Sequence, residues 1–235
     1  MADSHTKDAF VEFDRVQKSY DGENLVVKDL NLSLPKGEFL TMLGPSGSGK
    51  TTCLMMLAGF ETATHGDIRL DGQPINNIPP HKRGIGMVFQ NYALFPHMTV
   101  AENLSFPLEV RKMPKTEREA KVKHVLELVQ MGEFGGRRPA QLSGGQQQRT
   151  AIARALVKEA QLLLLDEPLV NLDYKLREDL RIELQEIFRK RSAIVVYTTT
   201  EPSEALMLGG NVVVLDEGRV LQTGATTTVY QRPET

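Results

Sequence analysis

Short apolar runs alternate along the chain with longer segments of helical periodicity. We expect strands over residues 37–43, 85–89, 162–165, 194–198 and 212–215. Residues 174–191 carry Leu176, Leu180 and Leu184 four positions apart, which predicts an amphipathic helix against a core. A similar period marks residues 123–131. Because strands separated by helices pack in parallel, the pattern predicts an α/β fold.

Composition places the chain among ordinary globular proteins. Its 235 residues suffice for one large domain or two small ones, with 40% hydrophobic and 25% charged residues. A net charge of -2 offers no general attraction to phosphate backbones, which disfavours a nucleic-acid partner. No apolar run approaches the roughly 20 residues of a membrane helix. The opening lacks a secretory signal and Cys53 is the single cysteine, so we expect a cytosolic chain.

A glycine-rich segment between a predicted strand and a predicted helical run over 52–58 carries the first chemical signal. It matches the spacing of a phosphate-binding P-loop, Gly-x4-Gly-Lys-Thr. Its residues are Gly44, Pro45, Ser46, Gly47, Ser48, Gly49, Lys50 and Thr51, followed by Thr52. Backbone N–H groups of such a loop surround a phosphate, while Lys50 can neutralise its oxygens and Thr51 can ligate Mg²⁺. The segment therefore predicts a nucleotide site rather than a turn with an accidental lysine.

Two carboxylates, Asp166 and Glu167, end the apolar run 162–165. Ligands gather at the carboxyl ends of parallel strands, so Asp166 can hold the Mg²⁺ shell and Glu167 can polarise the attacking water. Alone, such a pair is more often a solvated turn. The P-loop in the same chain favours the nucleotide site.

Residues 142–146 read Leu-Ser-Gly-Gly-Gln and precede a helix expected over 147–158. With both nucleotide motifs beside it, the chain resembles the ATP-binding subunit of an ABC transporter over nearly its whole length. The resemblance implies a P-loop NTPase (RecA-like) core, an N-terminal antiparallel β subdomain and a helical insertion over roughly 91–140. All of these would form one domain, 1–235. A plain helix N-cap is the alternative role for this motif.

The resemblance also implies that ATP lies between two subunits arranged head to tail. Ser143, Gly144, Gly145 and Gln146 would then face the P-loop of the partner subunit. These four residues would address its γ-phosphate. A serine hydroxyl and glycine N–H groups at a helix start suit that anion.

Two further positions match the family outside these motifs. Gln90, after the run 85–89, corresponds to the glutamine that contacts Mg²⁺ and water and connects to the membrane partner. Tyr20 occupies the aromatic position that stacks on adenine, which suits an aromatic face. An ordinary exposed or core tyrosine is the alternative.

The segment Asn171 to Asp173 resembles the loop that crosses the dimer interface and couples the two ATP sites. Val170, before it, stands where the family commonly has a small polar residue. Asp173 also precedes the predicted helix, so a simple N-cap role competes with nucleotide binding.

Thr200 stands where family members usually carry a histidine that contacts the γ-phosphate. A threonine hydroxyl is shorter than imidazole and carries no positive charge, so we expect ATP binding to survive better than hydrolysis. One interpretation is a slow half-site that works with a second, nonidentical ATPase subunit. The other is that Thr200, a water or a neighbouring group substitutes, which leaves an active homodimer.

Residues 91–103 resemble importer ATPases for sugars, polyols and polyamines. In those proteins this region receives a helix of the transmembrane permease; a self-contained helical bundle is the alternative. Residues 167–176 and 198–206 look most like glycerol or polyol subunits, whereas the N-terminal half equally suits a polyamine subunit. The implied partners are a second ATP-binding subunit, permease subunits and, indirectly, a solute-binding protein, at the cytoplasmic face of the membrane.

Other functional classes fit the motifs less well. Soluble ABC-type ATPases of DNA repair, chromosome structure or translation insert a long coiled coil or carry two cassettes, and here each motif occurs once. A nucleotide-gated scaffold without useful hydrolysis stays open. Members of the importer branch commonly continue into a β-rich regulatory domain; because this sequence ends at Thr235, we expect the chain to lack it.

Overall fold

A computed structural model describes residues 9–170, 172, 174–189 and 193–234 of the chain. The chain divides into two compact units. The first unit joins Met1–Ile85 with Arg191–Thr235, and the second is Gly86–Lys190. Both units combine helices and strands, as the alternating pattern predicts.

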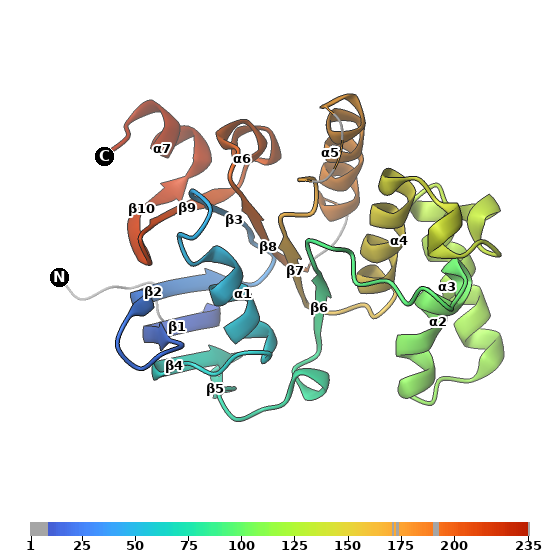
Figure 1. The fold of residues 1–235 in the computed structure, drawn as a ribbon, viewed down its shortest axis with the longest axis horizontal. Helices are drawn as coiled ribbons and strands as arrows, with labels where there is room; N and C mark the ends of the chain where they lie inside the picture. The colour runs from blue at the N-terminus through green and yellow to red at the C-terminus, as the bar shows by residue number, and fades with distance from the viewer. Residues whose placement is uncertain (1–8, 171, 173, 190–192, 235) are drawn as a thin grey trace. The chain divides into compact units, whose positions relative to one another are not determined.

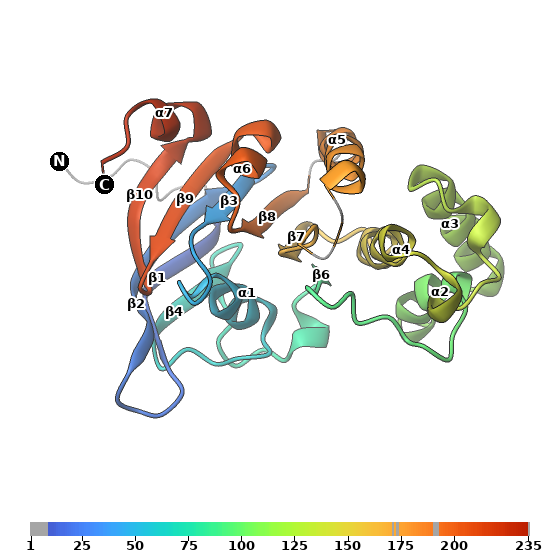
Figure 2. The same ribbon diagram turned by 45° about the horizontal axis from the view of Figure 1, so that its top comes forward.

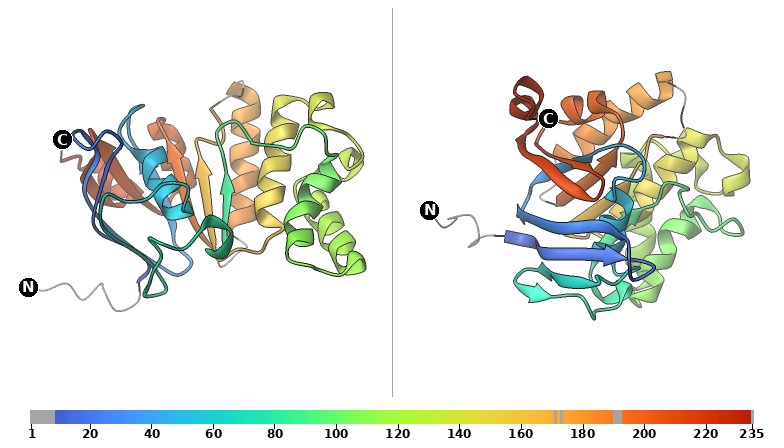
Figure 3. Two further views of the ribbon diagram at one scale, coloured as in Figure 1. Left: turned by 60° about the horizontal axis from the view of Figure 1, so that its bottom comes forward. Right: turned by 60° about the vertical axis from the view of Figure 1, so that its left-hand side comes forward.

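An antiparallel sheet opens the first unit. Its strands are β1 (Ala9–Ser19), β2 (Leu25–Pro35), β4 (His65–Leu70) and β5 (Gln73–Pro74), in the order β2-β1-β4-β5. The right-hand view of Figure 3 shows this sheet in blue and teal. Buried Leu30, Leu32 and Leu34 alternate with exposed residues along β2, the pattern of a strand with one solvated face. The expected N-terminal antiparallel β portion is present.

The second sheet of this unit is mixed, with a parallel centre. Its neighbours are β10 (Arg219–Ala225), β9 (Asn211–Asp216), β3 (Phe39–Leu43) and β8 (Ile194–Thr199), in that order. Strands β8 and β9 run parallel to β3, whereas β10 pairs antiparallel with β9. Every residue of β8 is buried, as expected of a strand covered on both faces.

Helices of the first unit pack around these strands. They are α1 (Lys50–Ala58), α6 (Pro202–Leu208) and α7 (Thr226–Gln231), with a 3-10 turn at Pro80–Lys82. Figure 2 shows α6 and α7 next to β9 and β10. Ala205, Val212 and Val229 form the apolar cluster beneath them.

Within the described residues, the second unit contains two neighbouring strands and four α-helices. The strands are β6 (Ile85–Val88) and β7 (Leu162–Asp166), and the helices are α2 (Val100–Val110), α3 (Lys115–Leu128), α4 (Gly144–Leu156) and α5 (Tyr174–Arg189). Short 3-10 turns lie at Gly132–Phe134 and Pro139–Gln141. Helices α2, α3 and α4 contact one another, which Figure 1 shows. Within the described ranges, no helix is long and apolar enough to span a membrane.

Several sequence-predicted boundaries are wrong by a few residues. Helix α4 starts at Gly144 instead of 147, because Ser143 caps it. Helix α3 starts at Lys115, well before the periodic segment 123–131, since its first turns are polar and exposed. Strand β8 extends one residue further than expected, to Thr199.

Buried Asn103 fixes the start of the helical region of the second unit. Its Oδ1 accepts from the Phe95 amide at 2.9 Å. Its Nδ2 donates to the carbonyl oxygens of Phe95, Met98 and Thr99 at 3.2, 3.3 and 2.9 Å. One side chain thus binds several backbone groups of an irregular, part-buried segment.

Replacing Asn103→Leu should lower the free energy of unfolding by about 1–3 kcal/mol, because the part-buried Phe95 amide loses its acceptor and three carbonyl oxygens lose a donor. Urea denaturation measures this loss. Val110→Ala, at an exposed position of the same helix, should change stability by less than about 0.5 kcal/mol. Equal effects of the two variants would show that the Asn103 contacts contribute nothing.

Candidate nucleotide site

The P-loop connects β3 to α1 and is built on close backbone approaches. Gly44 donates its amide to the Thr199 carbonyl at 3.3 Å, and Ser48 donates to the Pro45 carbonyl at 3.2 Å. A Cβ on Gly44 would lie 2.1 Å from the Leu215 carbonyl oxygen, so only glycine fits there. Gly49, the N-cap of α1, has a φ of +100°, which likewise requires glycine.

Lys50 lies over this loop. Its side chain is 3% exposed, and Nζ donates to the carbonyl oxygens of Gly44 and Pro45 at 2.8 and 2.9 Å. Pro45, Ser46 and Gly47 are exposed, whereas Ser48 is buried. The ammonium is therefore held at a loop whose outer turn is open to solvent, which suits an anionic ligand.

Tyr20 lies beside the same helix. Its ring is 59% exposed, its hydroxyl is 3.5 Å from Oγ1 of Thr52, and the Lys18 ammonium stands 4.7 Å from the ring centroid. The structure thus brings Tyr20 next to the start of α1, and its stacking on adenine stays a prediction. A solvent-facing ring can stack on a planar base.

The turn that presents Tyr20 is held by the Asp21 carboxylate. This group accepts from the Ser19 hydroxyl and from the backbone amides of Glu23 and Asn24. Hydrogen bonds from the Asn24 side chain and from these donors hold the pKa of Asp21 far below its usual range. Asp21 therefore stays ionised and the turn keeps its hydrogen bonds at any physiological pH.

Thr200 follows the carboxyl end of β8, next to the start of the P-loop. Leu43 pairs with Thr199 across β3 and β8, and the Thr199 carbonyl accepts from Gly44. Buried Glu204 fixes this end of the strand, because its Oε2 accepts from the Tyr197 hydroxyl at 2.9 Å and from the Thr199 hydroxyl at 2.6 Å. No pattern in the sequence predicts this role of Glu204.

The second unit supplies Asp166, Glu167 and Gln90 from its two neighbouring strands. Asp166 ends β7 and is 3% exposed. Glu167 follows with a φ of +43°, an uncommon backbone state for a non-glycine residue and one found at functional sites. Gln90 Nε2 donates to Glu167 Oε2 at 3.5 Å. The adjacent strands thus join two residues that the sequence separates widely.

The signature motif forms the N-terminus of α4. Ser143 Oγ accepts from the Gln146 amide at 3.4 Å, and Gln146 Oε1 accepts from the Ser143 amide at 3.0 Å, which makes a capping box. Both side chains serve as a helix cap. The Ser143 hydroxyl keeps its own proton to donate, and Gly144 is exposed whereas Gly145 is buried.

The loop expected at the dimer interface is only partly visible. Asn171 and Asp173 lie outside the described residues. Val170 is exposed, and the carbonyl of buried Leu172 accepts from Arg177 at 3.2 Å.

The candidate magnesium ligands are oxygen donors of hydroxyl, amide and carboxylate type. Thr51 belongs to the first unit, and Gln90 and Asp166 belong to the second. Among the described residues, no group of three or more His, Cys, Asp or Glu side chains could hold a metal ion. Each of the three residues offers the hard oxygen donor that Mg²⁺ prefers.

Comparison with known proteins identifies the family. The family model described as ABC transporter matches residues 27–170. The chain belongs to the ABC transporter family. A spermidine/putrescine import ATP-binding protein of Bacillus thuringiensis (strain Al Hakam) is 45% identical over 225 residues, 96% of this chain and 68% of that protein. Family membership confirms the predicted ATP-binding subunit and its enzymatic class, an ATPase coupled to transport.

Solved cassettes share this fold. The ATP-binding cassette MJ0796, in a dimeric structure bound to ADP and Pi, has a TM-score of 0.82 at 33% identity, over 92% of this chain and 98% of that one. The cbiO1 protein from Clostridium perfringens, part of the ABC transporter complex cbiONQ, has a TM-score of 0.87 at 28% identity, over 97% and 93%. They confirm the P-loop NTPase fold predicted from the motifs.

Arg154 of this ABC cassette is a positioning residue that the sequence analysis missed. It lies on α4 and donates to the carbonyl oxygens of Tyr92 and Ala93 at 2.9 and 2.7 Å. Those two residues follow Gln90 closely and have φ values of +62° and +46°. The Arg154 guanidinium also lies 5.5 Å from the Phe95 ring centroid. The helix that begins with the signature therefore holds the segment after Gln90 in a strained backbone conformation.

Replacing Arg154→Gln should release this segment, because two charge-assisted hydrogen bonds are lost. Amide hydrogen exchange of a peptide covering residues 91–99 should become about tenfold faster. Arg111→Gln removes a comparable contact with the Lys158 carbonyl and should leave this peptide unchanged. If amide exchange in residues 91–99 stayed as slow in Arg154→Gln as in the parent, Arg154 would not position this segment.

Proposed function

We propose that this chain is the ATP-hydrolysing subunit of an importer for small organic cations of the polyamine class. The Gln90 to Glu167 hydrogen bond at the ends of neighbouring strands carries the ATPase part of the proposal, because it joins a carboxylate to an amide that can orient the attacking water. The 45% identity to a spermidine/putrescine import protein over 96% of this chain supports the solute class. The likeness of residues 167–176 and 198–206 to polyol subunits favours a polyol as the second candidate.

The first unit would bind the nucleotide through its P-loop. Backbone N–H groups of residues 46–52 cradle the phosphates, Lys50 neutralises the β- and γ-phosphate oxygens, and Tyr20 stacks on adenine. Lys50 would exchange its contacts with two loop carbonyls for contacts with phosphate.

The second unit would supply the hydrolytic residues. When bound, Mg²⁺ neutralises charge on the phosphate oxygens, and Thr51, Gln90 and Asp166 have the donor chemistry to hold it. Glu167 accepts a proton from the attacking water, and Gln90 keeps the Glu167 carboxylate oriented.

A second ATP-binding subunit would complete the site in a head-to-tail dimer. Ser143, Gly144, Gly145 and Gln146 then face the γ-phosphate bound to the partner, with Asp173 at the same interface. Exposed Gly144 at the start of α4 supports this role, since helix N-termini attract anions. In this proposal Thr200 makes hydrolysis slow at this site. A second, nonidentical ATPase subunit in the dimer could then supply the faster site.

The two units would together form one ABC ATPase domain with a helical insertion over roughly 91–140. That insertion would receive the transmembrane permease at the cytoplasmic face of the membrane. A solute-binding protein would act indirectly, through the permease. The backbone anchored by Asn103 and Arg154 gives this surface a fixed shape.

Reconstitution with the permease subunits encoded beside this chain tests the proposal. Spermidine or putrescine, delivered by the binding protein, should raise ATP turnover, whereas glycerol should not. Glu167→Gln should lower turnover roughly 100-fold or more while it retains ATP, because it removes the group that takes the proton. The control Glu234→Gln, at an exposed position outside the insertion, should behave as the parent. If glycerol raised ATP turnover and the polyamines did not, the transported solute would be a polyol instead of a polyamine.

Replacing Thr200→His should raise the ATP turnover of the dimer, because imidazole adds a longer donor beside the P-loop. Phosphate release at saturating ATP measures this effect. Thr227→His, at an exposed position of α7, serves as the matched control. Parental turnover in a correctly folded Thr200→His variant would show that threonine does not limit hydrolysis.

A further inference from the structure

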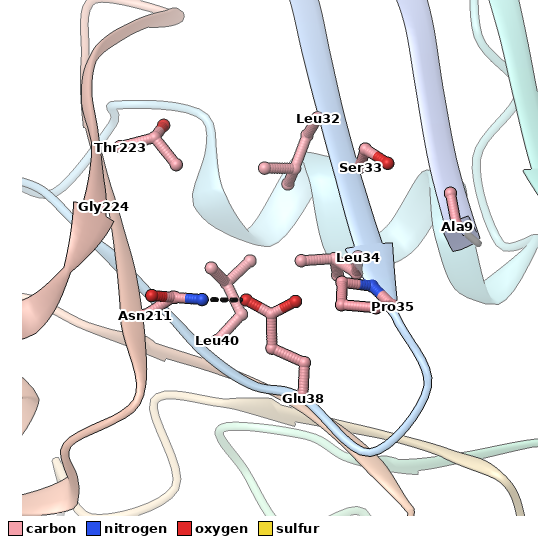
Figure 4. Close-up of a pocket in the computed structure, with 10 residues that line it drawn as sticks. All are labelled: Ala9, Leu32, Ser33, Leu34, Pro35, Glu38, Leu40, Asn211, Thr223 and Gly224. Atoms are coloured by element: carbon pink, nitrogen blue, oxygen red, sulfur yellow. Dashed lines mark hydrogen bonds between the residues drawn. The ribbon is translucent and has the colours of Figure 1, made fainter. Parts of the chain in front are cut away.

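A pocket of about 550 Å³ lies in the first unit, away from the nucleotide motifs. Strand β2 provides one wall, and β9 and β10 provide the other (Figure 4). None of its lining residues belongs to the P-loop, the signature or the strand ends that carry the candidate catalytic groups. A volume of this size is typical of small-molecule sites.

Glu38 is the one ionisable side chain among the described residues that line this pocket. It lies in the turn between β2 and β3, and its carbonyl accepts from the Val195 amide at 3.0 Å, which fixes the backbone. The carboxylate points into the pocket and accepts a hydrogen bond from Asn211 Nδ2, drawn as a dashed line in Figure 4. The position of this charge is therefore well defined.

No cation compensates the Glu38 charge within the described ranges. Its hydrogen-bond donor, Asn211, is a neutral amide, and the structure gives Glu38 no ion pair there. Burial raises the pKa of Glu38 above its ordinary value, against the opposing effect of the Asn211 hydrogen bond. A cation that approaches such a half-buried, ionised carboxylate stabilises it.

The rest of the pocket lining combines aliphatic residues with the polar residues Ser33, Asn211 and Thr223. Leu32 and Leu34 come from β2, and Leu40 comes from β3. Figure 4 shows these side chains around the Glu38 carboxylate. Leu34 and Leu40 are each only 1% exposed, so the carbon surface that a ligand can reach comes mainly from Leu32, Ala9 and Pro35. A ligand there meets one negative charge beside this apolar surface, and a neutral hydrocarbon would leave the charge uncompensated.

We propose that this pocket binds a small organic cation, a primary ammonium on a short aliphatic stem. The ammonium donates to Glu38 in a charge-assisted hydrogen bond, and the stem packs on the accessible carbon of Leu32, Ala9 and Pro35. The site is separate from the nucleotide site, and the proposal stands whether or not the transported solute is itself an amine.

Calorimetry on the purified chain with two amines tests this inference. n-Butylamine represents a free amine, and Nα-acetyl-lysine amide represents the lysine side chain of another protein. At least one of them should bind with a dissociation constant below about 10 mM, within reach of so small a ligand. n-Butanol, which has the same stem without the charge, should bind at least about tenfold more weakly. No binding of either amine, or equal binding of butanol, overturns the proposal.

Glu38→Gln supplies the decisive variant, because it removes the charge while it keeps the side-chain size. Amine affinity should fall about tenfold or more, and butanol affinity should stay the same. Glu133→Gln, an exposed change in the second unit, controls for overall charge. Unchanged amine affinity in Glu38→Gln contradicts the assignment.

A substitution at the pocket edge tests the site if Glu38→Gln impairs folding. Thr223 is exposed on β10 and lines the pocket. Thr223→Phe should narrow the space and weaken both amines and butanol at least threefold, as steric filling does. Undiminished binding in this variant would place the amine elsewhere on the molecule.

Discussion

The parallel pairing of β3 with β8 and β9 is the constraint on which the first unit depends. It aligns the carboxyl ends of the three strands, so that the P-loop leaves β3 beside Thr199 and Leu215. The approach is so close that the loop must begin with Gly44. Burial of β8 on both faces stabilises this alignment, and the same contacts that stabilise the sheet position the loop for phosphate.

In the second unit, neighbouring strands also bring the residues that follow them together, and some of these residues have a strained backbone. Strands β6 and β7 are neighbours, so the residues after them, Gln90 and Glu167, come within hydrogen-bond distance. Glu167 adopts a left-handed conformation, as do Tyr92 and Ala93 in the segment after Gln90. Such conformations cost roughly 1–3 kcal/mol each and persist only where surrounding contacts enforce them. Arg154 supplies such contacts for Tyr92 and Ala93.

The sequence predicted those features that leave a local pattern. Apolar runs marked β3, β7 and β8, and fixed spacing marked the P-loop, because phosphate binding requires glycine at set positions. Arg154 and Glu204 left no such pattern, since a side chain that bonds a distant carbonyl or hydroxyl has no periodicity. The start of α4 was placed too late because the glycines of the signature, poor helix formers, form its first turn behind the Ser143 cap.

At Thr200, the contacts that hold the edge of the P-loop in shape are made by other residues, so the residue at position 200 affects the chemistry more than the structure. Glu204 orders the end of β8 through Tyr197 and Thr199, so this edge keeps its shape without an imidazole at position 200. Lys50 and the loop amides, which hold the phosphates in our proposal, do not depend on that residue. In our proposal, threonine at position 200 therefore offers no charged donor to the γ-phosphate and leaves the binding scaffold in place. Loss of such a donor weakens transition-state stabilisation more than ground-state binding, which is why we expect ATP affinity and turnover to respond differently at this position.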